Sequence, residues 1–224
     1  EHSMNIRLNG RGAIITGGSK GLGLAMAKTF AEAGGNVAII ARDAGSLAKA
    51  EAEIRAPAPG VKVAAISADI RTAEGCEAAY AGALKGIGQV DILVNNAGTS
   101  QRGGFLDVTD ALWQDDLDLK LFAAIRLCRL AIPAMRDRKW GRVINVLNIG
   151  AKAPLAGSTP TSVSRAAGMA LTKAMANEFA PHNVLVNAML VGIIESDQWV
   201  RRHAAEKRNI SWEEWKAEQG KPVP

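Results

Sequence analysis

The chain has 224 residues, of which 48% are hydrophobic and 22% are charged. This is the ordinary composition of a soluble globular protein and is enough for one large domain. No apolar run is long enough to span a bilayer, and the lysines and arginines behind the net charge of +5 are dispersed along the chain. We therefore expect no membrane segment, no nucleic-acid partner and a cytoplasmic location.

The N-terminus and the cysteines add two expectations. Residues 1–4 are too short and too polar for a signal peptide, and we interpret them as a cloning remnant. Cys76 and Cys128 lie in apolar helical patterns, which favours buried thiols over a disulfide. The three histidines have no ligand spacing, so we expect no metal site.

Short β-branched runs alternate along the chain with stretches whose apolar period is near 3.6 residues. The predicted strands are Gly12–Thr16, Asn36–Ala41, Val61–Ser67, Asp91–Val94, Arg142–Leu147 and Val184–Met189. The predicted helices are Gly21–Gly34, Ala44–Arg55, Ala73–Lys85, Asp110–Arg138 and Thr161–Phe179. The alternation predicts right-handed βαβ crossovers, with helices on both faces of a parallel sheet. The predicted fold class is therefore α/β, a doubly wound (Rossmann-type) single domain over residues 5–195.

A glycine-rich turn, Thr16–Gly23, follows the first predicted strand and begins the first predicted helix. Glycines there permit a tight turn and let backbone N–H groups approach a pyrophosphate, beside the favourable dipole of the helix N-terminus. The alternative is a plain strand–helix turn, but the position after the first strand favours nucleotide binding. The residues expected to bind the cofactor here are Gly17, Ser19, Lys20, Gly21, Leu22 and Gly23.

The end of the second predicted strand bears on the choice of cofactor. In many NAD sites a carboxylate at this place binds the ribose 2′-hydroxyl. Here the strand ends in Ala41-Arg42, and Asp43 follows one residue later. Arg42 and Lys20 can flank a 2′-phosphate with charge-assisted hydrogen bonds, which favours NADP(H) over NAD(H). The alternative is that both are solvated surface cations.

Taken together, these motifs resemble those of the short-chain dehydrogenase/reductase family, from Leu8 to about Asp197. The residues that carry the resemblance are the turn Thr16–Gly23, Asp69, Asn95–Gly98, Trp113, Gly141–Asn145 and Val186–Ala188. The resemblance implies a nicotinamide-dependent oxidoreductase acting on a small carbonyl or alcohol substrate.

The resemblance also assigns further residues to the cofactor. Asp69 and Ile70 are expected to frame the adenine, and Asn95, Ala97 and Gly98 to pass beneath the cofactor. Asn95 can equally be a structural residue that bonds the central sheet.

In the turn after the sixth strand, the family has Pro-Gly followed by a threonine that touches the carboxamide. Gly192 and Ser196 stand in two of these places, and valine replaces the proline.

The catalytic positions depart from the family pattern. The family reduces a carbonyl with Asn, Ser, Tyr and Lys, and these positions fall on Lys120, Asn148, Thr161 and Arg165. Tyr80 is the only tyrosine, and it lies in a helical stretch on the flank of the predicted sheet. A threonine hydroxyl is a far weaker acid than a tyrosine, so the usual mechanism is absent.

The four replacements suggest an alternative chemistry. Lys120 is the candidate acid–base group, or a Schiff-base nucleophile, because burial and a second cation would lower its pKa. The alternative is that it reaches solvent or pairs with Asp116 or Asp118. Arg165, one turn after Thr161, can hold ribose hydroxyls, and Asn148 is either a donor to a substrate carbonyl or a loop residue.

The tail, residues 196–224, is predicted to form two short helices, Ser196–Arg208 and Ser211–Gln219, with Trp199, Trp212 and Trp215. It occupies the place of the family's substrate lid, within the same domain. Family members continue to a seventh strand that we do not find, so we expect an exposed edge on the sixth. The two long helices through which the family forms homodimers or homotetramers are present.

Three functions remain open. The first is an NADP(H)-dependent oxidoreductase with an atypical active site, whose proton comes from Lys120 or water. The second is a non-redox enzyme that grips an anionic substrate with Lys120 and Arg165. The third is a catalytically silent cofactor-binding protein, a sensor or a subunit partner.

Overall fold

The computed structural model describes residues 6–192, 203–204 and 209–220. The chain divides into two compact units, Glu1–Leu190 and Val191–Pro224. The predicted tail, residues 196–224, falls within the second unit, while residues 1–4 lie outside the described part.

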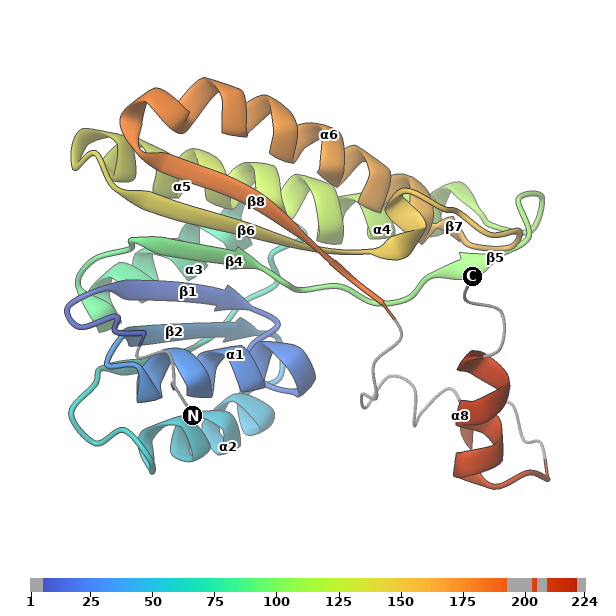
Figure 1. The fold of residues 1–224 in the computed structure, drawn as a ribbon, viewed down its shortest axis with the longest axis horizontal. Helices are drawn as coiled ribbons and strands as arrows, with labels where there is room; N and C mark the ends of the chain where they lie inside the picture. Colours follow the sequence, from blue (N-terminus) through green and yellow to red (C-terminus); the bar gives the residue numbers. More distant parts are fainter. Residues whose placement is uncertain (1–5, 193–202, 205–208, 221–224) are drawn as a thin grey trace. The chain divides into compact units, whose positions relative to one another are not determined.

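The first unit is built on a six-stranded parallel sheet (Figure 1). Its order is β3 (Val63–Ser67), β2 (Asn36–Ala41), β1 (Gly12–Thr16), β4 (Ile92–Asn95), β6 (Gly141–Asn148) and β8 (Val184–Val191). The order reverses at β1, which pairs in parallel with β2 on one side and β4 on the other. In such sheets a crevice for ligands opens at this switch point, outside the carboxyl ends of the strands.

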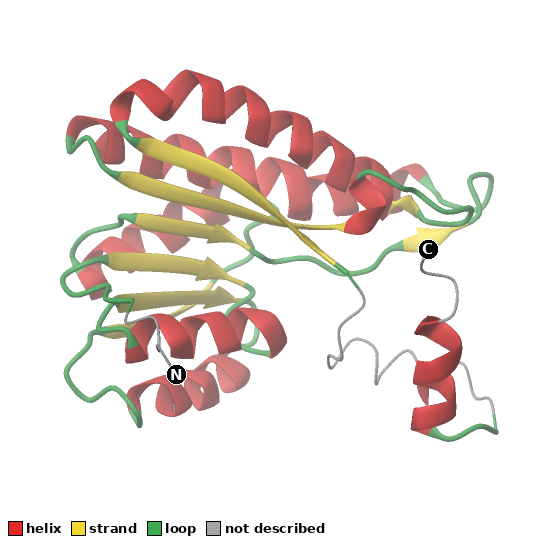
Figure 2. Ribbon diagram, viewed as in Figure 1, coloured by secondary structure: helices red, strands yellow, loops and turns green. Residues whose placement is uncertain are grey.

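Helices pack on both faces of this sheet (Figure 2). They are α1 (Gly21–Glu32), α2 (Ala44–Arg55), α3 (Ala73–Ile87), α4 (Asp110–Leu117), α5 (Ala123–Asp137) and α6 (Thr161–Phe179). One hydrophobic cluster joins α3, α5 and α6 to the sheet, while α1 and α2 bury small and aliphatic side chains on the other face. Capping fixes several helix starts: Asp43 accepts from Ser46 N at 2.7 Å, and Thr72 from Gly75 N at 3.0 Å.

The predicted helix Asp110–Arg138 forms as one helical run, Asp110–Asp137, whose hydrogen-bond pattern changes in the middle. A π-helical turn, Asp118–Phe122, separates α4 from α5. An i→i+5 turn holds one more residue than an α-helical turn, and apolar periodicity does not reveal it because the register changes by a single position. The turn carries Lys120, one of the candidate catalytic residues.

A two-stranded antiparallel ribbon, β5 (Arg102–Gly103) and β7 (Thr159–Pro160), was not predicted. Its strands are too short to show an alternating pattern. The ribbon joins the loop after β4 to the start of α6, where Thr161 N donates to Gln101 O at 3.3 Å. It therefore brings Arg102 close to Thr161.

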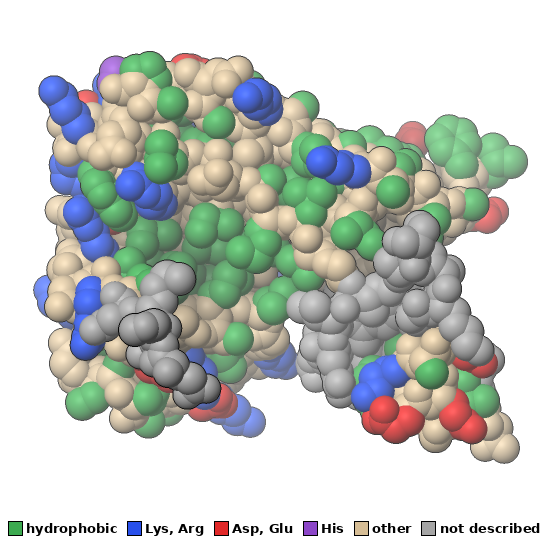
Figure 3. Space-filling model, in the orientation of Figure 1, with side chains coloured by type: hydrophobic (Ala, Val, Ile, Leu, Met, Phe, Trp, Pro, Cys, Tyr) green, Lys and Arg blue, Asp and Glu red, His purple; other side chains and the backbone are tan. Residues whose placement is uncertain are grey.

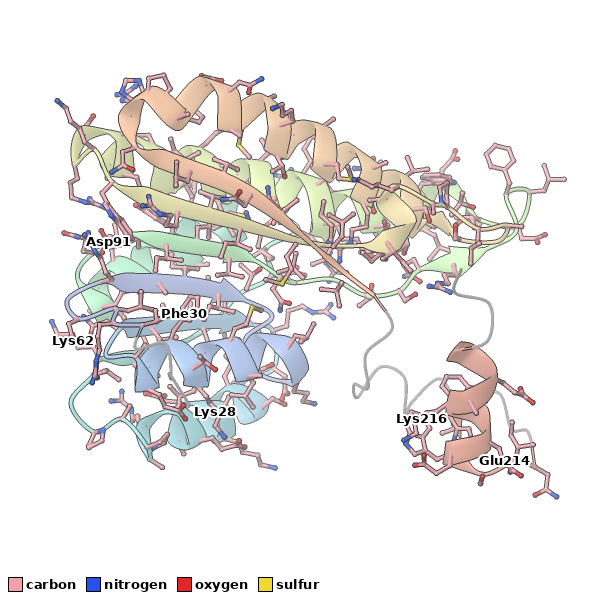
Figure 4. The ribbon with its side chains drawn as sticks, in the orientation of Figure 1. Lys28, Phe30, Lys62, Asp91, Glu214 and Lys216 are labelled. Atoms are coloured by element: carbon pink, nitrogen blue, oxygen red, sulfur yellow. The ribbon has the colours of Figure 1, made fainter. Side chains whose placement is uncertain are left out.

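The two ends of the sheet have different chemistry. At the amino ends of the strands, the buried Asp91 accepts from Gly12 N at 3.0 Å and pairs with Arg11 at 3.5 Å and Arg138 at 3.4 Å (Figure 4). This carboxylate is fully partnered and holds the ends of β1 and β4 together. The candidate functional residues lie at the opposite, carboxyl ends.

The edge of the sheet at β8 is apolar. Among the described residues no strand pairs with its outer side. Leu185 and Met189 are exposed there, and hydrophobic side chains gather on this face (Figure 3).

The second unit contains α8 (Trp212–Gly220), which matches the predicted helix Ser211–Gln219 to within one residue at each end. Ser211 and Glu214 form a reciprocal capping box: Ser211 N donates to Glu214 at 2.9 Å, and Glu214 N to Ser211 Oγ at 3.2 Å (Figure 4). Trp215 is buried and stacks on Trp212.

The other predicted tail helix, Ser196–Arg208, lies mostly outside the described residues, as do Ser196 and Trp199. None of the helices described in either unit has the length and apolarity that a membrane crossing needs.

Candidate functional site

The turn Thr16–Gly23 has the tight geometry that its glycines predict. Gly17 adopts φ of +66°, and its N–H donates to Ile40 O at 2.8 Å. A Cβ built on Gly23 would lie 2.2 Å from the Gly17 carbonyl oxygen, so only glycine fits where α1 packs on the turn. The turn is thereby held against the ends of β1 and β2.

The N-terminus of α1 has no cap from the protein. Lys20 is the N-cap residue, with extended backbone and no side-chain capping hydrogen bond. A Cβ built on Gly21 would meet nothing within 4 Å. Free N–H donors beside open space fit an anionic group such as a pyrophosphate, so the residues present are suited to a dinucleotide.

Thr16 and Asn96 connect this turn to the loop after β4. Thr16 Oγ1 accepts from Asn96 N and Ala97 N, both at 2.9 Å, and Asn96 Nδ2 donates to Thr16 O at 2.9 Å. Both residues lie in motifs named from the sequence, Thr16–Gly23 and Asn95–Gly98, but neither was assigned a contact of its own. The feature that could have identified them is their position at the carboxyl ends of adjacent parallel strands, where polar side chains lie close together.

A surface hollow of about 520 Å³ adjoins the turn and contains both predicted 2′-phosphate ligands. Ser19, Lys20, Arg42 and Asp43 are among its lining residues. The Asp43 carboxylate accepts from Ser46 N, and hydrogen bonds from Ser46 lower its pKa. The one nearby carboxylate is therefore engaged in capping α2, whereas Lys20 and Arg42 both face the hollow.

The predicted adenine-framing residues have protein partners of their own. Asp69 pairs with Arg71 at 2.6 Å, and Arg71 also pairs with Asp115 at 2.6 Å. Hydrogen bonds from Arg71 lower the pKa of Asp69. Ile70 is buried in the hydrophobic core. Their contact with adenine remains a prediction.

Asn95 forms the structural bonds that were its alternative role. Its Nδ2 donates to Asn145 Oδ1 at 2.9 Å, and Asn145 Nδ2 donates to Thr172 Oγ1 at 2.9 Å. This chain of amides joins β4, β6 and α6. Asn95 Oδ1 is buried without a hydrogen-bond partner. The contact of Asn95 with the cofactor remains a prediction.

The four candidate catalytic residues come from separate elements: Lys120 from the π-helical turn, Asn148 from the end of β6, and Thr161 and Arg165 from α6. Lys120 Nζ donates to Thr161 Oγ1 at 2.8 Å and also to Asp116 Oδ1. The Lys120 side chain is completely buried. It therefore does not reach solvent, and of the two carboxylates considered it pairs with Asp116.

Asp116 is buried and holds Lys120 from one side. Its second oxygen, Oδ2, accepts from Ser164 Oγ at 2.6 Å, so one carboxylate joins α4, the π-helical turn and α6. Ser164 was not identified from the sequence, although it lies three residues after Thr161 and therefore on the same side of the helix. Asp116 lies four residues before Lys120, so helical spacing likewise places these two side chains on the same side of their helix.

Burial lowers the pKa of Lys120 to about 8. Asp116 opposes this shift by hydrogen bonding and by its charge, while the charges of Arg165 and Arg102 add to it. An amine with a pKa near neutrality exchanges protons readily, which is the property expected of an acid–base group.

Arg165 is held by the end of β6. Its Nη1 donates to Val146 O at 2.9 Å, and its Nε is buried without a partner. A Cβ built on Gly98 would lie 2.5 Å from Arg165 Nη2 and 3.6 Å from Lys120 Cε. Gly98, in the loop after β4, therefore lies against both side chains, the Arg165 guanidinium and the Lys120 methylene chain.

Other predicted residues are not part of this cluster. Asn148 Oδ1 is buried without a partner, near Gly150 and Ser162. Tyr80 lies in α3 against the hydrophobic core, as expected. Gly192 is exposed in the second unit. Cys76 and Cys128 are free and buried, as predicted.

Three comparisons bear on this site. The family model for short chain dehydrogenases matches residues 11–207. The chain is 34% identical over 194 residues to a 3-oxoacyl-acyl-carrier-protein reductase, FabG, of Aquifex aeolicus, covering 87% of this chain and 78% of that one. L-Sorbose reductase from Gluconobacter frateurii, complexed with NADPH and L-sorbose, has a TM-score of 0.89 and 33% identity, covering 95% of this chain and 81% of that one.

A short chain oxidoreductase from Pseudomonas aeruginosa PAO1, NADPH-bound and containing an atypical catalytic center, is also similar. It has a TM-score of 0.87 and 36% identity, covering 96% of this chain and 81% of that one. Sequence, fold and family model agree along nearly the whole length, and on these grounds the chain belongs to the short-chain dehydrogenase/reductase family of oxidoreductases.

Proposed function

We propose that the protein is an NADP(H)-dependent oxidoreductase that interconverts a carbonyl and an alcohol, with Lys120 in place of the usual tyrosine as acid–base group. The observation that carries this proposal is the hydrogen bond of 2.8 Å from the buried Lys120 Nζ to Thr161 Oγ1. This pair stands at the family's catalytic positions, beyond the same strand ends that hold the nucleotide turn.

The preference for NADP(H) rests on charge. Lys20 and Arg42 line the hollow beside the turn, and Asp43 is engaged with Ser46 N. With two cations in this hollow, and its carboxylate engaged in capping a helix, the site favours the 2′-phosphate of NADP(H) over the free 2′-hydroxyl of NAD(H). The two similar solved structures with NADPH support the same choice.

When bound, the nicotinamide supplies or accepts the hydride. During reduction, Thr161 Oγ–H donates its proton to the substrate oxygen and takes another from Lys120 Nζ. The alkoxide product is a far stronger base than an amine, so this net transfer from Lys120 is downhill. Thr161 itself need not be an acid, because its hydroxyl only relays the proton. In oxidation the proton moves in the reverse direction.

The remaining residues bind and orient. Asp116 and Ser164 hold the Lys120 ammonium toward Thr161. Arg165, at the family's lysine position, is proposed to donate to the nicotinamide ribose hydroxyls. Asn148 is proposed to face the substrate. Gly192 and Ser196 remain candidates for the carboxamide end of the cofactor.

We also propose a homodimer or homotetramer, since apolar side chains are exposed on β8 (Leu185 and Met189) and near the start of α6 (Val163). The tail, residues 196–224, is proposed to serve as the substrate lid of the same domain. The cytoplasmic location stays a prediction.

Fluorescence titration with NADPH and NADH, followed by NADPH oxidation across a panel of aldehydes, ketones and sugars, tests the function. We expect NADPH to bind more tightly and at least one carbonyl to be reduced. Lys120→Ala should lower turnover by about 10²- to 10⁴-fold, the range for general acid–base catalysis, without changing the NADPH Kd.

Lys173→Ala is the matched control, because Lys173 is an exposed lysine on α6. It should leave both binding and turnover unchanged. Full turnover in Lys120→Ala would remove this residue from the mechanism. NADPH binding without oxidation across the whole panel would instead favour a catalytically silent cofactor-binding protein.

A further inference from the structure

The buried cluster at the candidate active site holds two cations and one carboxylate. Asp116 binds both Lys120 and Ser164 through its two oxygens. Arg165 has one hydrogen bond, to the backbone at Val146, and forms no ion pair within the part of the chain that the structure describes. A buried charge without a counter-charge is unfavourable. The cluster therefore has one positive charge more than its carboxylate balances.

The unused part of Arg165 has a specific shape. A guanidinium has five N–H donors, and here Nη1 uses one of them on Val146 O. The opposite edge, made of Nε and Nη2, presents two parallel donors in the fork that matches a carboxylate. Nε is buried without a partner, and Nη2 is the atom that a Cβ on Gly98 would meet. This edge is directed at the loop after β4.

We propose that the substrate is an oxo acid or hydroxy acid whose carboxylate binds the Nε–Nη2 edge of Arg165. This inference rests on the proposed function and names its substrate class. Ribose hydroxyls would accept from the guanidinium without balancing its charge. When a carboxylate binds the Nε–Nη2 edge and Val146 O binds Nη1, two of the five N–H donors remain free for the ribose. A carboxylate both balances the charge and orients the neighbouring carbonyl toward Thr161.

The surroundings of the cluster favour the same ligand. Lys120 is affected by the positive charges of both Arg165 and Arg102, and Arg102 stands on β5, whose partner strand β7 leads into Thr161. Of the carboxylates in the described residues, it is Asp116 whose charge acts on Lys120. An anion bound at Arg165 therefore joins a cluster whose charge is otherwise positive.

Binding of matched acids and esters to NADP⁺-saturated protein tests the proposal, because the oxidised cofactor cannot reduce a ketone. The probes are pyruvate, acetoacetate and levulinate, each against its methyl ester, by isothermal titration calorimetry. We expect at least one acid to bind about tenfold or more tightly than its ester. Arg165→Gln should abolish that preference, and Arg165→Lys should retain part of it.

Two further variants keep the test decisive. Arg129→Gln changes an exposed arginine on α5 and should leave the preference intact. If Arg165→Gln does not fold, Gly98→Ala places a methyl group against Nη2 without removing the charge, and should weaken binding of the acid more than of the ester.

The outcomes separate this inference from the proposed function. Equal binding of acid and ester in all three pairs, with NADPH binding intact, overturns the anionic substrate and leaves the oxidoreductase standing. A preference that survives Arg165→Gln in folded protein overturns it as well, since the carboxylate then binds elsewhere. Absence of nucleotide binding would overturn the proposed function, and the same acid–ester comparison without nucleotide would still decide the role of Arg165.

Discussion

Lys120 Nζ and Thr161 Oγ1 are 2.8 Å apart, although 41 residues separate them in the chain. The π-helical turn presents the amine, and the first residue of α6 presents the hydroxyl. The hydrogen bond gives a weakly acidic hydroxyl direct access to a proton on an amine with a lowered pKa.

The first prediction concerns the pH dependence of reduction. The pKa of Lys120 is lowered to about 8 by burial, and reduction requires its protonated form. We expect kcat/KM for reduction to be constant at low pH and to fall about tenfold per pH unit above that value. The oxidation rate should rise through the same range. Identical profiles in the two directions would contradict this assignment.

The same shift affects stability. The pKa of Lys120 in the fold lies below its usual value of 10.5, so between about 8 and 10.5 the unfolded chain binds more protons than the folded one. This residue therefore makes the fold more stable as pH rises through that window, and least stable below it. Urea unfolding of the wild type and of Lys120→Met at several pH values isolates the contribution.

The second prediction concerns Asp116 as a positioning residue. Its hydrogen bond and charge raise the pKa of Lys120, so Asp116→Asn should lower that pKa further. We expect the alkaline fall in the reduction rate to move by about one pH unit or more toward lower pH. Asp107→Asn, at an exposed loop carboxylate, is the control and should not move it. An unmoved profile in folded Asp116→Asn would leave Asp116 with a purely structural role.

The third prediction concerns Arg42 and cofactor preference. Removing a charge-assisted hydrogen bond to a phosphate costs about 1.5–3 kcal/mol. Arg42→Ala should therefore weaken NADPH binding by about 10- to 100-fold and change the NADH Kd little. The exposed Lys85 on α3 provides the control variant Lys85→Ala. Equal losses for the two cofactors would show that Arg42 does not bind a 2′-phosphate.

The fourth prediction concerns the close contact between α1 and the turn. In Gly23→Ala the new methyl group would lie 2.2 Å from the Gly17 carbonyl oxygen, so backbone must move. We expect a loss of about 1–3 kcal/mol in the free energy of unfolding and weaker binding of both cofactors. Gly60→Ala, which meets nothing within 4 Å, should change neither. Denaturation curves and NADPH titration of both variants measure this; full affinity in Gly23→Ala would show that the turn adapts.

Much of the fold could be predicted because the apolar pattern repeats regularly. The strands Gly12–Thr16 and Asn36–Ala41 and the helix Thr161–Phe179 were predicted with their observed bounds. The two strands are buried on both faces and read as continuous apolar runs, and the helix has a buried face that a period of 3.6 reveals. The ribbon β5–β7 and the π-helical turn could not be predicted this way, since two-residue strands and a one-residue change of register leave no periodic signal.

The candidate site was predictable only in part. Lys120, Thr161 and Arg165 were found by their place in the family pattern, and Asp116 only as an alternative partner of Lys120. Ser164 and Arg102 were missed because their roles arise from tertiary contacts: α6 packs on α4, and the pairing of β5 with β7 places Arg102 opposite Pro160. Side-chain networks between distant elements depend on packing geometry, which local patterns do not contain.

The π-helical turn Asp118–Phe122 has an evolutionary consequence. It contains one residue more than the α-helical turn it replaces, so deletion of a single codon would restore a regular helix from α4 to α5. If the deleted residue lies between Asp116 and Lys120, their spacing shortens and one rotates relative to the other by about 100°, the angle between successive residues of an α-helix. Loss of one codon is therefore enough to separate Lys120 from Thr161. The sheet and the nucleotide turn would stay intact.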